Sequence, residues 1–154
     1  MIAVEISDHF IAHLRQGITS RGLRNVDIVH ADVQQLELEP ASIDGAWARW
    51  VFTFLKQPER AVEGLARALK PGARVLVHEY VAYESMHLAP KSAAFEKARD
   101  AVITSWRATG GEPNIALELP TLFSEYGLEL EAIRPLATAV RPGEPRWLWP
   151  ETFF

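Results

Sequence analysis

Short apolar runs that alternate with helix-like segments are the feature that most constrains the fold of this chain. The first run, Ile2–Val4, stops at Glu5; it is too short for a helix and is typical of a buried parallel strand. Helical patterns, each with apolar residues along one face, separate the later runs. Strands that alternate with helices predict a doubly wound α/β fold with a mostly parallel sheet. The expected strands are 2–4, 26–29, 43–48, 74–78 and 128–133.

The ends of the expected helices carry residues that commonly begin or stop a helix. Ser7 is a good N-cap, and Pro58 suits a first turn, where its missing N–H costs nothing. Glycines supply the stops at Gly22, Gly110 and Gly127. We therefore expect helices between Ser7 and Gly22, from Pro58 to Leu69, over 95–106 and over 119–126.

Composition and charge exclude several classes of protein. The 154 residues are enough for one domain with a sizeable core, and 48% apolar with 23% charged residues is ordinary for a globular protein. The chain has no cysteine, which excludes disulfides and thiolate metal sites. A net charge of −4 argues against a nucleic-acid partner. No apolar run is long enough for a membrane span and no targeting signal is evident, so we expect a cytoplasmic protein.

The domain organisation follows from a change of pattern near residue 140. Residues 1–140 carry the alternation of strands and helices, whereas residues 141–154 hold Pro142, Pro145 and Pro150 and show little periodicity. We expect one α/β domain over 1–140 and a proline-rich tail over 141–154.

Acidic side chains follow two of the expected strands. Glu5 ends the first strand, and Asp32 follows the second at the equivalent edge. Ligands of open α/β sheets bind beyond the carboxyl ends of the strands, where an acid can accept the hydroxyl protons of a ribose. Asp32 can accept a proton from an adenine amino group there. The alternatives are a solvated carboxylate favoured by a helix dipole for Glu5, and an ordinary loop acid for Asp32.

Arg49 and Trp50 follow the third expected strand and should face the same edge. The indole can exclude water or stack on a ligand, and the guanidinium can hold an anionic group. A core role for Trp50 is the alternative, because Phe52, Phe54 and Leu55 lie close by in the sequence.

Histidines and tyrosines near the fourth strand are candidate bases, but none is assigned a catalytic role. His78, Tyr80 and His87 can each take a proton from a substrate in principle. His9 and His13 lie four residues apart on an expected helix, yet no third ligand accompanies them, so no metal site is predicted.

The order and spacing of these segments resemble class I S-adenosylmethionine-dependent methyltransferases over most of 1–141. Such a resemblance implies a Rossmann-like sheet, S-adenosylmethionine as cofactor and a small-molecule methyl acceptor. By position, Glu5 would bind the ribose hydroxyls, Ile6 would pack on the adenine, and Asp32 with the Val33 backbone would contact the adenine amino edge. Arg49 and Trp50 would lie near the methionine and the acceptor. The stretches that carry the resemblance are 4–7, 29–32, 43–47, 67–75, 110–115, 119–123 and 127–128.

The chain departs from this family at two places. Nothing in it matches the family's first strand and its Gly-x-Gly-x-Gly loop, and no antiparallel strand is evident near the C-terminus. Both strands are interior in the family's sheet, so we expect an incomplete sheet with unpaired backbone, which makes self-association into a homo-oligomer plausible.

Two other functions stay open from the sequence. One is a non-catalytic remnant or interaction module that keeps the fold without holding the cofactor. The other is an NAD(P)-dependent oxidoreductase, because those enzymes also place an acid after the second strand.

Overall fold

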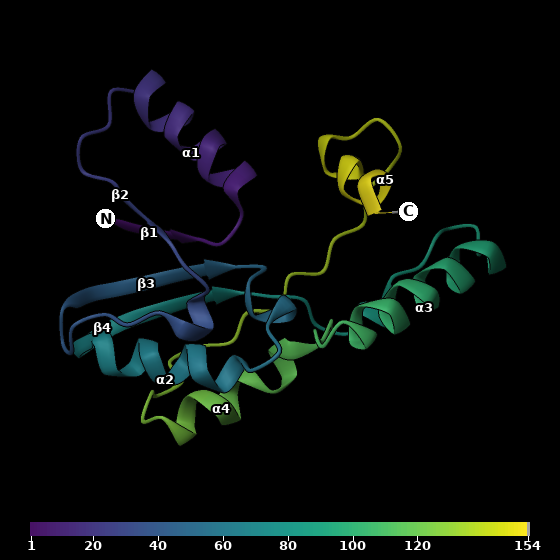
Figure 1. The fold of residues 1–154 in the computed structure, drawn as a ribbon. Coiled ribbons are helices and arrows are strands. Elements are labelled where there is room, and N and C mark those ends of the chain that lie inside the picture. The colour runs from purple at the N-terminus through teal and green to yellow at the C-terminus, as the bar shows by residue number, and fades with distance from the viewer. Residues whose placement is uncertain (154) are drawn as a thin grey trace. The chain divides into compact units, whose positions relative to one another are not determined.

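The computed structural model describes residues 1–153, so Phe154, the last residue of the expected tail, lies outside the described residues. The chain is a mixed α/β protein, as the alternating pattern predicts (Figure 1). Its elements are β1 (Ile2–Glu5), α1 (Asp8–Ser20), β2 (Asp27–His30), η1 (Val33–Gln35), β3 (Ile43–Arg49), η2 (Phe52–Phe54), α2 (Pro58–Ala68), β4 (Leu69–His78), η3 (Tyr83–Ser85), α3 (Ala93–Ala108), η4 (Ile115–Leu117), α4 (Leu119–Glu125), η5 (Pro145–Trp147) and α5 (Leu148–Phe153).

The chain divides into two compact units. Unit 1 comprises Met1–Trp47 and Gln57–Leu76, and unit 2 comprises Ala48–Lys56 and Val77–Phe154. The division at residue 140 that the sequence suggests stays a prediction.

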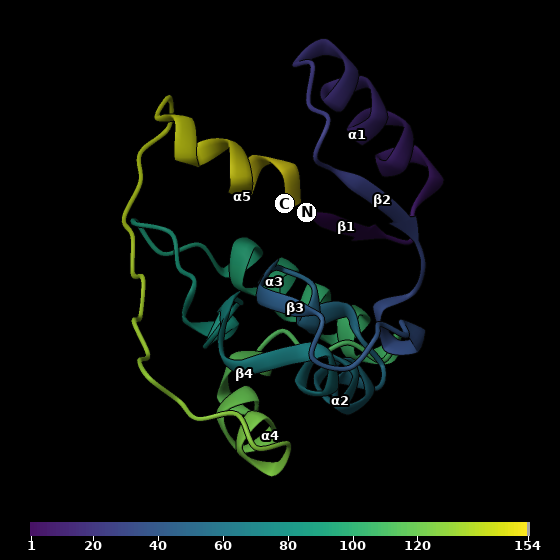
Figure 2. The ribbon, with the colours of Figure 1, turned by 90° about the vertical axis from the view of Figure 1, so that its left-hand side faces the viewer.

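In unit 1, β1 and β2 form a parallel pair that runs from Ile2 opposite Asp27 to Glu5 opposite His30 (Figure 2). Helix α1 follows β1 and buries Ile11. The parallel strand predicted at the N-terminus is therefore present, but its residues are exposed or half-buried rather than buried. Because β1 pairs with another strand on one edge only, it lacks the full cover that a central parallel strand has.

Strands β3 and β4 form a second two-stranded sheet. Backbone hydrogen bonds flank this pair from the Ser42 N–H to the Ala68 carbonyl and from the Trp50 N–H to the His78 carbonyl, so the strands run parallel. Within the described residues, the two pairs are separate sheets rather than one continuous sheet.

The transition from α2 to β4 differs from the expected one. The sequence predicts a helix to Leu69, a turn and then a strand from Arg74, whereas the structure ends α2 at Ala68 and begins β4 at Leu69. Hydrogen bonds from the segment before β3 reach Arg67 and Ala68 and bring the chain into the sheet at once. Gly72 takes the positive φ of +77° that the expected turn requires.

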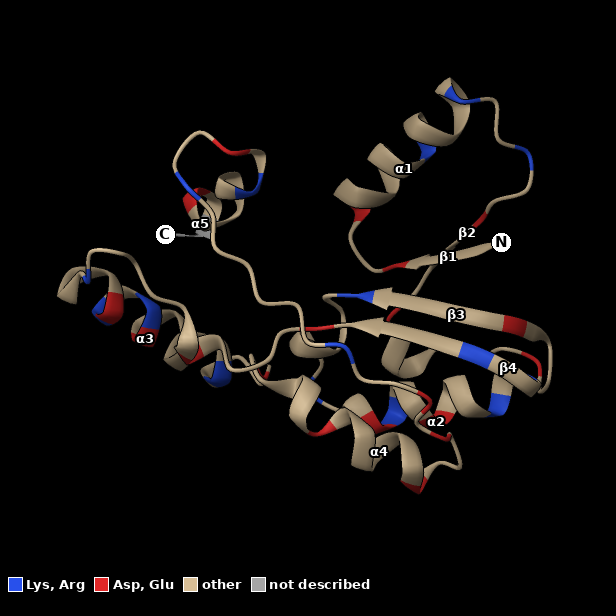
Figure 3. Ribbon diagram, turned by 180° about the vertical axis from the view of Figure 1, so that it is seen from behind, with Lys and Arg blue, Asp and Glu red and all other residues tan. Residues whose placement is uncertain are grey.

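Unit 2 contains the longer helix α3 and the short helix α4. The Ser92 hydroxyl accepts a hydrogen bond from the Phe95 N–H at 3.2 Å and caps α3. Gly127, at φ +77°, follows α4 as predicted. Basic and acidic residues both lie along α3 (Figure 3). The buried apolar side chains of this unit include Phe52, Tyr83, Pro113, Ile115 and Leu119.

The strand predicted over Leu128–Ile133 is wrong, because this segment has no regular structure. Leu130 and Ile133 are 54% and 66% exposed. Alternating apolar residues form a strand only where a neighbouring strand and a core surface accept them, and here they meet neither.

Within residues 1–153, no helix combines the length and apolar character that a bilayer crossing requires.

Candidate functional site

The carboxyl ends of β1 and β2 bring two acidic residues to one end of unit 1. Glu5 is the last residue of β1 and lies opposite His30, the last residue of β2, with Asp32 two residues further on. The Ala31 N–H donates to the Glu5 carbonyl at 3.1 Å and extends the pairing toward Asp32. Parallel pairing therefore produces the arrangement of acids that the sequence suggests.

The Glu5 carboxylate holds the turn into α1. Its Oε1 accepts hydrogen bonds from the Ile6 N–H at 2.9 Å and the Ser7 N–H at 2.8 Å. Ser7 is the N-cap residue as predicted, but its own side chain makes no capping hydrogen bond. A carboxylate has about four acceptor positions, so these two bonds leave room for a ligand hydroxyl.

Ile6 and His30 lie beside this carboxylate. The Ile6 side chain is 61% exposed and offers an apolar surface next to Glu5. The His30 Nε2 lies 2.9 Å from the Ile6 carbonyl and so ties the end of β2 to the turn after β1. No local pattern singles out His30, because its partner is a backbone atom 24 residues away.

Asp32 is fixed by its own loop. As the N-cap of η1, its Oδ1 accepts a hydrogen bond from the Gln34 N–H at 2.9 Å, and the Gln34 side-chain amide donates to both carboxylate oxygens at 3.1 Å. The Gln34 Oε1 in turn accepts from the Gln57 N–H at 2.8 Å, just before α2. Val33, next to Asp32, is half-buried.

In unit 2, Arg49, Trp50 and Tyr80 form a stack of planar groups. The Arg49 guanidinium carbon lies 4.0 Å from the Trp50 ring centroid, within range for a cation–π contact. The Trp50 and Tyr80 rings stack at 5.3 Å with an interplanar angle of 10°. Trp50 is half-buried, and its φ of +54° is in the left-handed region.

Glu79 is a functional candidate that the sequence analysis missed. Its Oε1 accepts hydrogen bonds from the Val51 N–H at 2.7 Å and the Phe52 N–H at 2.8 Å. Burial raises the pKa of the Glu79 carboxyl, against the opposing effect of these backbone N–H groups. Its Oε2 is buried and has no hydrogen-bond partner among the described residues. The available signal was its position directly after the expected strand 74–78, much as Glu5 lies at the end of the first strand.

Aromatic side chains from distant segments of unit 2 meet at Tyr80 and Tyr83. The Trp149 Nε1–H donates to the Tyr80 hydroxyl at 3.2 Å, and Trp106 packs edge-on against both tyrosines. Tyr83 is 3% exposed, and its hydroxyl has no hydrogen-bond partner within the described part of the chain. Burial raises the pKa of the Tyr83 hydroxyl to about 12, so it stays protonated at neutral pH.

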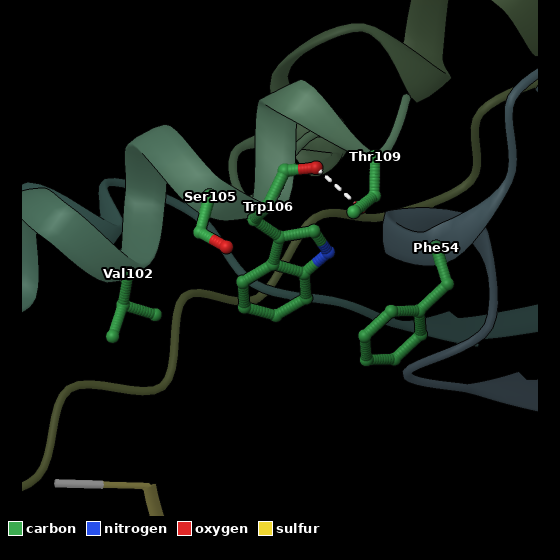
Figure 4. A pocket seen from close by; sticks show the side chains of 5 residues that line it. All are labelled: Phe54, Val102, Ser105, Trp106 and Thr109. Atoms are coloured by element: carbon green, nitrogen blue, oxygen red, sulfur yellow. Dashed lines mark hydrogen bonds between the residues drawn. The ribbon is translucent and has the colours of Figure 1, made fainter.

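A hollow of about 270 Å³ is lined by side chains of η2 and of the C-terminal part of α3 (Figure 4). Two of its lining residues, Phe54 and Trp106, stack on each other at 4.9 Å, and the Thr109 hydroxyl donates to the Trp106 carbonyl at 2.7 Å. No lining residue is ionisable, so the hollow offers contact surface rather than acid–base chemistry. Its lining residues are Phe54, Val102, Ser105, Trp106 and Thr109.

The candidate bases are engaged within the protein. The His87 Nδ1 lies 3.6 Å from the Glu96 carboxylate and 3.4 Å from the Arg99 guanidinium. His78 is half-buried, with its ring 6.0 Å from that of Trp50. Across residues 1–153, His, Asp and Glu nowhere form a group of three or more that can hold a metal ion.

Comparison with known families gives a match over the first half of the chain. The model of a family described as "Methyltransferase domain" matches residues 1–77 of the 154. These residues include Glu5, Ile6, Asp32, Val33, Arg49 and Trp50.

Solved structures share the fold at low sequence identity. The (4+2)-cyclase SpnF matches with a TM-score of 0.60 and 22% identity, over 82% of this chain and 42% of the cyclase. Phosphoethanolamine N-methyltransferase 2 of Haemonchus contortus, in complex with phosphomonomethylethanolamine and S-adenosylhomocysteine, matches with 0.60 and 21%, over 82% and 27%. A SAM-dependent methyltransferase from Thermotoga maritima matches with 0.59 and 23%, over 82% and 53%. This chain therefore spans about half or less of each of these proteins.

Proposed function

We propose, from the premise that the chain belongs to the methyltransferase domain family, that it transfers a methyl group from S-adenosylmethionine to a small-molecule acceptor. The observation that carries the proposal is the family match over the segment that brings Glu5 and Asp32 to one end of a parallel pair.

The residues at this end have the chemistry that an adenosine requires. Glu5 retains acceptor positions for the two ribose hydroxyls, and the exposed Ile6 side chain offers an apolar face for the adenine. Asp32, next to the Val33 backbone, accepts a hydrogen bond from the adenine amino group in the proposed complex. These residues therefore fit the adenosine half of the cofactor.

The methyl transfer asks little of the protein beyond alignment. When bound, S-adenosylmethionine supplies a sulfonium methyl group that an acceptor atom attacks in line, and the thioether leaves. Arg49 and Trp50 orient the methionine and the acceptor and exclude water. A small acceptor is supported by the N-methyltransferase of Haemonchus contortus, whose structure contains a phosphomonomethylethanolamine.

Calorimetric titration with S-adenosylhomocysteine tests the cofactor assignment. We expect wild-type protein to bind it, and Glu5→Ala to lose about 1.5–3 kcal/mol of binding free energy, the range for hydrogen bonds that involve a charged group. Glu63→Ala, which removes an exposed carboxylate of α2 in the same unit, is the matched control and should bind like wild type.

Equal affinity of wild type and Glu5→Ala would refute the role of Glu5. No binding by wild type would favour the non-catalytic module instead. Displacement of S-adenosylhomocysteine by NADH at comparable concentration would favour the oxidoreductase.

A further inference from the structure

The turn between β3 and η2 is held by a side chain from the end of the neighbouring strand. Glu79 directly follows β4, yet its Oε1 binds the N–H groups of Val51 and Phe52, which are 28 and 27 residues earlier in the chain. The two bonds, at 2.7 and 2.8 Å, are short and involve a carboxylate, the stronger class of hydrogen bond. A single oxygen therefore fixes the backbone directly after Trp50.

Trp50 itself has a backbone conformation that the two hydrogen bonds to Glu79 must maintain. Its φ of +54° is unfavourable for any residue with a Cβ atom, and such conformations persist only where the surrounding structure over-determines them. The Trp50 N–H donates to the His78 carbonyl on one side, and the Glu79 carboxylate holds the following two N–H groups on the other. Together these bonds direct the indole onto Tyr80 and beneath the Arg49 guanidinium.

The far end of η2 has additional attachments that do not involve Glu79. The Thr53 hydroxyl donates to the Glu112 carbonyl at 2.9 Å, and the Trp106 Nε1–H donates to the Thr53 carbonyl at 3.1 Å. Phe54 stacks on Trp106. Loss of the Glu79 carboxylate should therefore release the Trp50–Val51 end of the segment while the remainder stays anchored.

We propose that Glu79 is a positioning residue of the methyltransferase site, which acts by holding Trp50 and, through it, Arg49 in their stacked arrangement. The inference rests on the proposed function, because the position of Arg49 and Trp50 affects the site only if these two residues contact the methionine and the acceptor. In this proposal Glu79 acts through the backbone of Val51 and Phe52 and not by contact with the methionine or the acceptor.

Near-UV circular dichroism tests the hold on Trp50 without reference to activity. The spectrum of wild type minus that of Trp50→Phe isolates the signal of the stacked indole. We expect this difference signal to be lost when it is measured in a Glu79→Ala background, and to return with Glu79→Gln, whose amide oxygen can accept the same two N–H groups. Glu118→Ala, an exposed glutamate of the same unit, should leave it unchanged.

Calorimetric titration with S-adenosylhomocysteine tests the consequence for the site. We expect Glu79→Ala to bind it roughly three- to tenfold more weakly, as coupling between neighbouring side chains predicts. Glu79→Gln should restore the affinity, and the double variant Trp50→Phe/Glu79→Ala should bind no more weakly than Trp50→Phe alone. This non-additivity separates action through Trp50 from a general loss of structure.

Retention of the Trp50 signal in Glu79→Ala, or effects that add in the double variant, would overturn the proposal. Should Glu79→Ala fail to fold, Glu79→Asp keeps the charge but withdraws the oxygen by one methylene, and it must show the same losses in smaller measure. Absence of S-adenosylhomocysteine binding by wild type would refute the proposed function, while the dichroism still decides whether Glu79 holds Trp50.

Discussion

Glu79 shows at the scale of one residue how burial and hydrogen bonding oppose each other. Withdrawal of the carboxylate from water raises its pKa above the usual 4.5, although backbone groups, those of Val51 and Phe52 foremost, favour the charged form. The folded protein therefore binds the Glu79 proton more tightly than the unfolded chain does. The contribution of this group to stability is present below its usual pKa and is lost as pH rises through the raised pKa.

Glu79→Gln should remove this pH dependence, because an amide does not ionise. We expect the free energy of unfolding of Glu79→Gln to rise relative to wild type between about pH 4 and pH 8. Urea denaturation across this range measures it.

Glu84→Gln provides a control of opposite sign. A hydrogen bond from the Asn114 side chain lowers the pKa of the exposed Glu84, whose stabilising contribution is present above its usual pKa and is lost as pH falls. Relative to wild type, Glu84→Gln should therefore lose stability as pH rises. The same trend in both variants would contradict the assignment.

The two tyrosines of the aromatic cluster differ by one hydrogen bond. Tyr83 buries a hydroxyl for which the described residues offer no partner, whereas Tyr80 accepts a hydrogen bond from Trp149. Tyr83→Phe should leave the free energy of unfolding unchanged or raise it by up to about 1 kcal/mol, because an unpaired buried polar group costs free energy. Tyr80→Phe should lower it by about 0.5–1.5 kcal/mol. Chemical denaturation compares them; greater damage from Tyr83→Phe would refute this reading of the cluster.

At the scale of elements, the same substitution to alanine should have opposite effects on stability at two glycines. A Cβ at Gly111 would lie 2.6 Å from the Thr53 carbonyl oxygen and 2.7 Å from Trp106 Cδ1. Gly111→Ala should therefore destabilise the protein by about 1–3 kcal/mol, as overpacking does. Gly17 lies within α1, where only the end of the flexible Arg21 side chain is near. Gly17→Ala should stabilise by about 0.5–1 kcal/mol, and thermal unfolding distinguishes the two.

Local signals in the sequence were sufficient to locate most helices and strands. Pro58 begins α2, and Gly127 follows α4, because each residue acts through its own backbone geometry. Leu128–Ile133 has an equally regular pattern but no strand, because a strand also needs a partner that the pattern does not contain. The start of β4 was misplaced because hydrogen bonds with the segment before β3 determine it.

The candidate site shows the same difference between features set by local residues and features set by distant ones. Position after two successive strands was enough to place Glu5 and Asp32 at one end of a parallel pair. The role of Glu79 depends on N–H groups 27 and 28 residues away and on the left-handed backbone of Trp50. No local pattern of residues carries that information. Whether Glu5 and Asp32 hold an adenosine stays a prediction.

At the scale of the whole molecule, the described strands form two separate pairs, and pairs of strands are marginally stable by themselves. A ligand that binds only the folded state should therefore have a visible effect. At a concentration of about 100 times its dissociation constant, S-adenosylhomocysteine should add about 2.7 kcal/mol to the free energy of unfolding. Differential scanning fluorimetry should show a rise in Tm that Glu5→Ala reduces at the same ligand concentration. An unchanged Tm in wild type would count against cofactor binding.

Gln34 fastens the loop after β2 on two sides, and the two attachments require opposite ends of one amide. Its nitrogen donates to Asp32, and its oxygen accepts from the Gln57 N–H before α2. Neither a carboxylate nor a hydrocarbon of the same shape satisfies both neighbours. Glutamate would keep the link to the residue before α2 but set a second negative charge against Asp32, so the side-chain nitrogen decides whether the side chain at position 34 attracts or repels that acid.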